Sequence, residues 1–145
     1  MNKLIITITF LTLFPFLPVQ ADENQILVEQ ECKRIGDKLG SVNVNDCLAI
    51  NLVATDGRSV KGAPILLKEY PPLPSRSPLG KVLLIGGIHG DEYSSVSIIF
   101  KWMRILDEYH SGLFHWNIIP LLNPDGLLRK DSQRMNENDV DLNRN

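Results

Sequence analysis

The sequence predicts an α/β fold that combines an antiparallel hairpin with a parallel strand–helix–strand unit. Three observations support this prediction. Two runs with strand character lie on either side of a turn signal within residues 47–70. A strand, a helix and a second strand then follow one another between residues 82 and 122. A hairpin gives antiparallel pairing, whereas a strand–helix–strand unit with short links gives two parallel strands.

The first 21 residues have the layout of a secretory signal peptide. Lys3 precedes an apolar run over residues 4–17, and small residues follow up to Ala21, where cleavage is expected. A membrane anchor is the alternative, but the run is shorter than the roughly 20 residues that a spanning helix needs, and Pro15 interrupts it. A lipoprotein is disfavoured because no cysteine stands at the cleavage point. We therefore expect an exported, periplasmic protein with no stable membrane anchor.

The composition excludes some classes of partner. The formal net charge of −2 argues against a nucleic-acid-binding surface and against polybasic membrane binding. The hydrophobic content of 43% is typical of a globular protein with its own core.

Two cysteines, Cys32 and Cys47, follow the signal segment. An even number of cysteines in an exported protein predicts a disulfide between them. Two free buried thiols are the alternative. A zinc site built from these cysteines is disfavoured because no second Cys or His pair stands nearby at finger spacing.

The segment before residue 76 is expected to contain a helix and a hairpin. Residues 24–39 carry apolar side chains at mostly helical spacing and stop before a glycine. Residues 47–54 and 63–70 are expected to be strands, with the turn at Asp56 and Gly57. Residues 71–80 are rich in Pro and Ser, which indicates a connector without regular structure.

The following unit is expected to place polar residues at one edge of the sheet. Residues 82–85 form a continuous apolar run, as expected for a strand covered on both faces. A helix over 94–106 and a strand over 114–122 follow, and Asn-Pro-Asp-Gly then gives a strong turn. Sites in such sheets form at the carboxyl ends of the strands, where His89 and Asn123 are expected to converge.

His89 and Glu92 lie between the first strand and the helix, in GGIHGDE. The flanking glycines allow a tight backbone that directs both side chains the same way. Imidazole and carboxylate are zinc ligands, and catalytic sites commonly combine two His and one Glu with an open water position. An isolated His-x-x-Glu more often marks a turn and a helix start, so the remaining motifs decide between the two interpretations.

Four elements occur in order: HGDE at 89–92, NPDG at 123–126, Arg134, and DLNRN at 141–145. Together they resemble the zinc carboxypeptidase family, also called funnelin metallopeptidases, over about residues 80–145. The residues of the first and last motifs are most similar to those of the bacterial murein peptide amidase branch. The aspartoacylase and succinylglutamate desuccinylase branch shares the first and last elements, but NPDG favours the peptidase side.

The resemblance implies roles for five residues. His89 and Glu92 match the family's first two zinc ligands. Arg134 matches the arginine that stabilises the oxyanion, a task for which a fixed guanidinium is suited. Asn143 and Arg144 match the pair that holds the terminal carboxylate of the substrate, which the planar guanidinium can grip with two hydrogen bonds.

Other interpretations stay open for some of these residues. Without the motif, Arg134 would be read as a surface cation and Arg144 as the partner of Asp141 in a structural ion pair. Asn123 and Asp125, in the NPDG turn, are expected to be scaffold that presents the arginine segment.

The sequence departs from the family at two points. Asp139 stands where the family often has Gly, and Asp tolerates left-handed backbone better than most residues. The family also requires a third zinc ligand, a His beyond DLNRN, and a carboxylate general base, which none of the 145 residues supplies. His110 and His115 are expected to lie away from the site.

We therefore expect three parts: a signal peptide over 1–21, a helix-and-hairpin segment over 22–75, and the N-terminal part of an incomplete catalytic domain over 76–145. The resemblance implies that the catalytic part belongs to a zinc carboxypeptidase-like mixed sheet flanked by helices. Whether residues 22–75 form a separate small domain or pack on that sheet stays open.

The predicted function is that of an exported zinc metallocarboxypeptidase or amidase. Its expected substrate is a peptide with a free carboxylate, such as a peptidoglycan stem peptide. An aspartoacylase-type deacylase of N-acyl amino acids is one alternative. A catalytically incomplete fragment or pseudoenzyme is the other, and the oligomeric state stays open.

Overall fold

The computed structural model describes residues 23–144. The signal peptide predicted for residues 1–21 lies outside the described residues. Within the described range, no helix has both the length and the apolar character that crossing a membrane requires.

The described chain begins with two helices that a disulfide joins. These are α1 (Glu23–Lys38), close to its expected position, and α2 (Val44–Ala49). Cys32 and Cys47, the pair expected from the sequence, form the disulfide, with their Cα atoms 5.5 Å apart. Both cysteines are fully buried, so the cross-link lies in the core rather than on the surface.

The strand predicted for residues 47–54 is wrong over most of its length. Residues 47–49 lie in α2, and the strand β1 (Val53–Arg58) begins only afterwards. The helix forms because the Asn43 side chain accepts a hydrogen bond from the backbone N–H of Asp46 at 2.8 Å, which caps its first turn. The apolar run that looked like a strand therefore contributes buried side chains from a helix and a short link.

The antiparallel hairpin is confirmed, but its turn lies later than predicted. β1 pairs with β2 (Pro64–Tyr70), and Asp56 and Gly57 are inside β1 rather than at the turn. The chain reverses at residues 59–62, where the Gly62 N–H donates to the carbonyl of Ser59 at 3.0 Å. Gly62 has φ of +84°, a left-handed conformation that glycine adopts without strain, and this fixes the turn there.

The sheet has four strands in the order β1-β2-β4-β3. β3 (Lys81–Ile85) and β4 (His115–Ile119) are joined by α3 (Tyr93–Tyr109) and pair in parallel, as the strand–helix–strand pattern predicted. β2 pairs with β4 in the antiparallel sense. The sheet is therefore mixed, and β2 from the N-terminal segment shares it with the two parallel strands.

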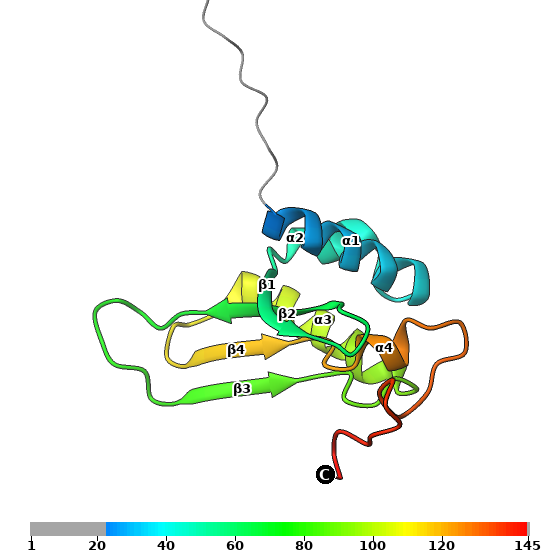
Figure 1. Cartoon of the computed structure of the whole chain (residues 1–145). Coiled ribbons are helices and arrows are strands. Elements are labelled where there is room, and N and C mark those ends of the chain that lie inside the picture. The colour runs from blue at the N-terminus through cyan, green and yellow to red at the C-terminus, as the bar shows by residue number, and fades with distance from the viewer. Residues whose placement is uncertain (1–22, 145) are drawn as a thin grey trace, which may run out of the picture.

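The described helices cover one face of this sheet (Figure 1). α3 packs on it with side chains at the spacing that predicted a helix, namely Val96, Ile99, Phe100 and Met103. The prediction that the strand over 82–85 is covered on both faces is wrong for the described residues. β3 is an edge strand, and Leu83 at its centre is 62% exposed.

We expect removal of the disulfide by the double substitution Cys32→Ala and Cys47→Ala to lower the free energy of unfolding by about 3 kcal/mol. The physical reason is that the cross-link restricts the unfolded chain over a separation of 15 residues. Urea unfolding followed by circular dichroism measures the change. A loss below about 0.5 kcal/mol would mean that the bond does not stabilise the native state.

Candidate metal centre

The loops that follow β3 and β4 lie against each other at the carboxyl edge of the sheet. The Gly86 N–H donates to the carbonyl of Ile119 at 2.8 Å, which continues the parallel ladder beyond β3. The Asn123 N–H then donates to the carbonyl of Gly87, also at 2.8 Å. The HGDE loop and the NPDG segment are therefore adjacent because the two strands pair.

The NPDG turn is a one-turn helix, α4 (Pro124–Leu127). The Asn123 side chain caps it by accepting a hydrogen bond from the Gly126 N–H at 2.9 Å. The amide group of the same side chain donates to the carbonyl of Arg134 at 3.2 Å. Asn123 is 2% exposed, so this buried residue serves as scaffold for the arginine segment, the role expected from its motif.

Gly90 allows the HGDE loop to approach α4 closely. A Cβ atom at this position would lie 2.2 Å from the carbonyl carbon of Gly126 and 2.4 Å from the nitrogen of Leu127. The Gly90 N–H also donates to the carbonyl of Arg134 at 3.3 Å. The loop and α4 thus hold the same stretch of backbone, the one that carries Arg134.

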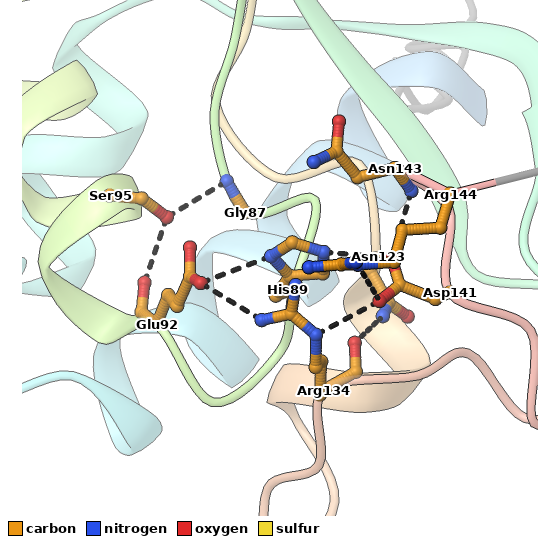
Figure 2. A network of polar contacts seen from close by, with 9 residues as sticks. All are labelled: Gly87, His89, Glu92, Ser95, Asn123, Arg134, Asp141, Asn143 and Arg144. Atoms are coloured by element: carbon orange, nitrogen blue, oxygen red, sulfur yellow. Dashed lines mark hydrogen bonds and ion pairs between the residues drawn. The ribbon is translucent and has the colours of Figure 1, made fainter.

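The start of α3 fixes the loop from the other side. The Ser95 hydroxyl accepts from the Gly87 N–H at 3.1 Å and donates to the carbonyl of Glu92 at 2.8 Å. Glu92 is the N-cap residue of α3, but its side chain makes no capping hydrogen bond. Its carboxylate is directed instead toward His89, which counts against a purely helix-stabilising role (Figure 2).

His89 lies between two carboxylates (Figure 2). The residue is 6% exposed. Its Nδ1 is 3.0 Å from Oε1 of Glu92, and its Nε2 is 2.9 Å from Oδ1 of Asp141. When Nε2 carries the proton and donates a hydrogen bond to Asp141, the lone pair of Nδ1 is left on the side of Glu92, which is the tautomer that a metal ligand through Nδ1 requires.

Asp141 connects the histidine with the arginines. Its Oδ2 accepts from Nε of Arg134 at 2.9 Å and is 3.6 Å from Nε of Arg144. Its Oδ1 also accepts from the backbone N–H of Asn143 at 3.0 Å. Burial alone would raise the pKa of Asp141. The hydrogen bonds from Asn143, His89 and Arg134, together with the guanidinium charge, outweigh burial and hold this pKa at about 2, so the group is an anion.

Arg134 is held by both carboxylates. Besides its bond to Asp141, its Nη1 lies 3.3 Å from Oε1 of Glu92. The hydrogen bond to Asp141 is the main reason that the pKa of Arg134 is raised above its ordinary value. The guanidinium is therefore fixed beside Nδ1 of His89 and Oε1 of Glu92, the two candidate metal-binding atoms.

A cavity of about 210 Å³ lies at this edge, lined by the end of β3, the HGDE loop, Ser95 and Asn143. His89 and Glu92 are part of its wall. Arg144 is mostly exposed, with 76% of its side chain accessible. A larger cavity of about 550 Å³ lies between α1, α2 and the start of β1, and none of the motif residues lines it.

The turn before DLNRN brings Asp141 back to the histidine. The Asp139 N–H donates to the carbonyl of Asn136 at 3.1 Å, and the Val140 N–H donates to the Asn136 side chain at 3.0 Å. Asp139 has φ of +57°, so the left-handed conformation expected at this position is confirmed.

Asp125 ties the N-terminal hairpin to the site. Its buried carboxylate accepts from the Ser59 hydroxyl at 2.8 Å and from the Lys61 backbone N–H at 3.0 Å. The Lys61 ammonium pairs with Glu137 at 2.9 Å, in the segment between Arg134 and Asp141. The hairpin turn therefore supports the backbone that carries two of the site residues.

The structure brings together the residues that the motifs singled out. His89, Glu92 and Arg134 share one polar network, which Arg144 joins through Asp141, and Asn143 lines the adjoining cavity. Sequence reasoning considered Asp141 only as a partner of Arg144 and missed its bond to His89. One signal in the sequence could have indicated this bond. Asp141 is an acidic residue within DLNRN, a motif that occurs together with the candidate ligand His89.

The other two histidines take no part in this network. His115 is 2.7 Å from Glu69, on the exposed part of the sheet, and His110 contacts the carbonyl of Phe114. These contacts match the packing and surface roles expected for them.

The donor atoms of His89 and Glu92 fit a zinc ion as a partial site. Two ligands of a tetrahedral zinc at ordinary bond lengths are about 3.3 Å apart. The separation between Nδ1 of His89 and Oε1 of Glu92 is 3.0 Å. Between residues 23 and 144, however, no group of three or more His, Cys, Asp and Glu side chains is placed to hold a metal. A zinc site built on this pair would need at least one further protein ligand.

Comparison with known proteins agrees with this geometry. Residues 78–145 match the model of the succinylglutamate desuccinylase/aspartoacylase catalytic domain. Murein peptide amidase A of Escherichia coli K12 is 37% identical over 89 residues, which cover 61% of this chain and 33% of that protein. Carboxypeptidase SOL1 of Arabidopsis thaliana is 34% identical over 111 residues, which cover 68% of this chain and 22% of that protein.

Solved structures share the fold. A metallopeptidase-like protein from Shewanella amazonensis SB2B superposes with a TM-score of 0.55 and 20% identity, over 78% of this chain and 40% of the other. Bovine thrombin-activatable fibrinolysis inhibitor superposes with a TM-score of 0.50 and 15% identity, over 79% and 36% of the two chains. The described chain thus has a carboxypeptidase-like α/β fold.

Over residues 78–145, the chain is similar to the zinc carboxypeptidase-like family. It spans about a third of the bacterial relative and about a fifth of the plant relative.

We expect Gly90→Ala to lower the free energy of unfolding by about 1–3 kcal/mol, because the added methyl group would overlap the backbone of α4. Gly40→Ala is the matched control, since nothing lies within 4 Å of a Cβ atom there, and its effect should stay within about 0.5 kcal/mol. Thermal and urea unfolding measure both changes. Equal effects at the two glycines would contradict the close approach of loop and helix.

Proposed function

We propose that this chain carries part of the active site of a zinc-dependent hydrolase that cleaves a peptide near its terminal carboxylate. The observation that supports the proposal most directly is the His89–Glu92 pair, whose donor atoms are 3.0 Å apart beside a fixed Arg134. Asn143 and Arg144 follow at the same edge of the sheet. The similarity of residues 78–145 to the zinc carboxypeptidase-like family supports a hydrolase of the metallopeptidase type.

In this proposal His89 and Glu92 hold the metal, and a third protein ligand comes from outside residues 23–144. Bound zinc supplies a Lewis acid and lowers the pKa of a water toward about 7. Asp141 accepts a hydrogen bond from the Nε2–H of His89 at 2.9 Å, which keeps Nδ1 available and the ring oriented. The low pKa of Asp141 keeps it in the accepting form.

Arg134 and Arg144 would then each have a separate role. Arg134 is held at 2.9 Å by Asp141, so its guanidinium can stabilise negative charge that develops on the substrate carbonyl oxygen. Arg144 is exposed, with only the 3.6 Å contact to Asp141, and retains donors for a carboxylate. Asn143 lines the cavity beside His89, where its amide can donate to the same carboxylate.

A peptide of the cell wall is the proposed substrate, and export to the periplasm the proposed location. The layout of residues 1–21 and the buried Cys32–Cys47 disulfide both suit an oxidising compartment. The name of the Escherichia coli relative, murein peptide amidase A, supports the same substrate class.

A deacylase of N-acyl amino acids is the second candidate. The observation that favours it is the family match over residues 78–145, whose description names a desuccinylase and an aspartoacylase. The chemistry would be the same, with a small acyl group in place of a peptide. A carboxylate-binding fragment without catalysis is the remaining alternative.

Zinc binding tests the metal pair. We expect His89→Ala and Glu92→Gln each to weaken zinc affinity by about tenfold or more, because each removes one of two ligands. His115→Ala is the matched control, because His115 also contacts a carboxylate, that of Glu69 at 2.7 Å. Calorimetric titration of the 145-residue chain with zinc measures the three affinities. Similar losses in all three variants would contradict the assignment.

Carboxylate recognition tests the substrate class, with the 145-residue chain or any longer protein that includes it as the enzyme. We expect amidation of the peptide's terminal carboxylate to lower kcat/KM by about 100-fold or more, because the Arg144 contact is lost. Arg144→Gln should abolish this discrimination between acid and amide. Peptide cleavage followed by mass spectrometry provides the rates. Turnover of N-acetylaspartate with no cleavage of wall peptides would instead favour the deacylase.

A further inference from the structure

A groove of about 390 Å³ lies between the C-terminal end of α1 and the segment that follows α4. Figure 1 shows these two parts of the chain on the same side of the molecule. The groove is lined by Arg34, Asp37, Lys38, Leu128, Arg129 and Lys130. Most of this lining is cationic, whereas the whole chain has a formal net charge of −2. The groove therefore concentrates positive charge on a protein whose net charge is negative.

The carboxylates beside this basic groove already have cationic partners. Asp37, the acidic residue in its lining, pairs with the Lys33 ammonium at 2.9 Å. Glu31 is buried and pairs with Arg34. The Arg34 side chain is still 44% exposed, and a guanidinium has five N–H donors, so Arg34 retains donors toward the groove. These carboxylates therefore leave the groove with an excess of positive charge.

Lys38 holds the opposite wall of the groove in place. Its ammonium donates to the carbonyl of Arg129 at 2.8 Å and to that of Lys130 at 3.0 Å. These bonds compensate the partial negative charge of two carbonyl oxygens that would otherwise repel an anion. The Arg129 guanidinium has only a 3.9 Å contact with Glu137, and the Lys130 side chain is exposed. Both side chains therefore have donors available for a ligand.

The segment that carries Arg129 and Lys130 is also fixed from its other end. The Tyr93 hydroxyl donates to the Ser132 hydroxyl, which in turn donates to the carbonyl of Leu127, each at 2.7 Å. The Lys38 ammonium lies 5.6 Å from the centroid of the Tyr93 ring, a cation–π contact. A wall that is fixed before a ligand arrives costs less conformational entropy on binding.

We infer that the basic groove binds a phosphate group, with Arg34, Arg129 and Lys130 as its donors. An arginine can donate two parallel hydrogen bonds to phosphate oxygens, and a lysine adds a compact positive charge. A volume of about 390 Å³ falls within the range of small-molecule sites. A soluble phosphate ester and the phosphate headgroups of a lipid surface would present the same chemistry.

This site is separate from the candidate metal centre, because the basic groove and the cavity beside His89 have no lining residue in common. The inference therefore goes beyond the proposed hydrolase. Failure of zinc binding at His89 and Glu92 would leave it intact, and failure of phosphate binding would leave the proposed hydrolase unaffected.

An NMR titration of the 145-residue chain with inorganic phosphate tests the site. Low salt and near-neutral pH are used, because salt screens exposed charges. We expect saturable shifts of the backbone amides of residues 128–130 and of the Nε–H groups of Arg34 and Arg129. The dissociation constant should be about 1 mM or lower. Succinate, a dicarboxylate of similar charge, should bind about tenfold more weakly, because its oxygens do not have the phosphate geometry.

Substitutions locate the contact. The double variant Arg129→Gln and Lys130→Gln should weaken phosphate binding by about tenfold or more, because it removes two of the three donors. The double variant Arg76→Gln and Lys101→Gln is the matched control. It removes the same charges from exposed positions outside the groove and should change binding less than about twofold. Circular dichroism and thermal unfolding verify that both variants remain folded.

Vesicles distinguish the two sources of phosphate. Sedimentation of the chain with phosphatidylglycerol vesicles but not with phosphatidylcholine vesicles, lost in the Arg129 and Lys130 variant, would assign a lipid headgroup. Phosphate binding without sedimentation would assign a soluble phosphate ester. Both results support the inference.

Three results would overturn the inference. One is that residues 128–130 do not respond to phosphate and the chain does not bind vesicles. Another is that succinate binds as tightly as phosphate, which would make the groove a general site for anions. The third is an equal loss of binding in the two double variants, which would reduce the effect to net charge.

Discussion

The parallel pairing of β3 with β4 is the constraint on which the candidate site depends. It brings two loops that are distant in sequence to the same edge, where the Asn123 N–H bonds to the carbonyl of Gly87 at 2.8 Å. The backbone of Arg134 is then held by Gly90 on one loop and by Asn123 on the other. A disturbance of this contact would move the arginine and the histidine loop together.

Charged side-chain contacts add to the backbone hydrogen bonds in fixing the site residues. Asp141 is shared by His89 and Arg134, at 2.9 Å from each, and its pKa is about 2. A carboxylate this strongly bound stays charged and keeps the imidazole oriented, with Nδ1 facing Glu92. The partial exposure of Glu92 and Arg134 leaves the open side of the pair accessible to a metal or a substrate.

The N-terminal segment contributes to the site although it carries no motif residue. Its β2 strand is part of the sheet, and its hairpin turn bonds to the buried carboxylate of Asp125. Lys61 of the same turn reaches Glu137 beside the arginine segment. The hairpin thus belongs to the framework that fixes the edge of the sheet.

The sequence by itself determined the strand–helix–strand unit and the candidate metal pair, from apolar spacing, glycine punctuation and motif order. The left-handed position at Asp139 followed from the resemblance, because the family often has Gly there. It did not determine the start of β1, because the Asn43 cap competes with an apolar run that equally suits a strand.

Only the tertiary structure decided that Asp141 would bond to His89, 52 residues away, or that Asp125 would bind the hairpin turn. It also left Leu83 exposed on an edge strand where its neighbours in sequence suggested burial. The physical reason is that pairing partners and burial depend on which strands lie side by side. The hydrophobic periodicity of one segment indicates its secondary structure, but not which other segments pair with it or cover it.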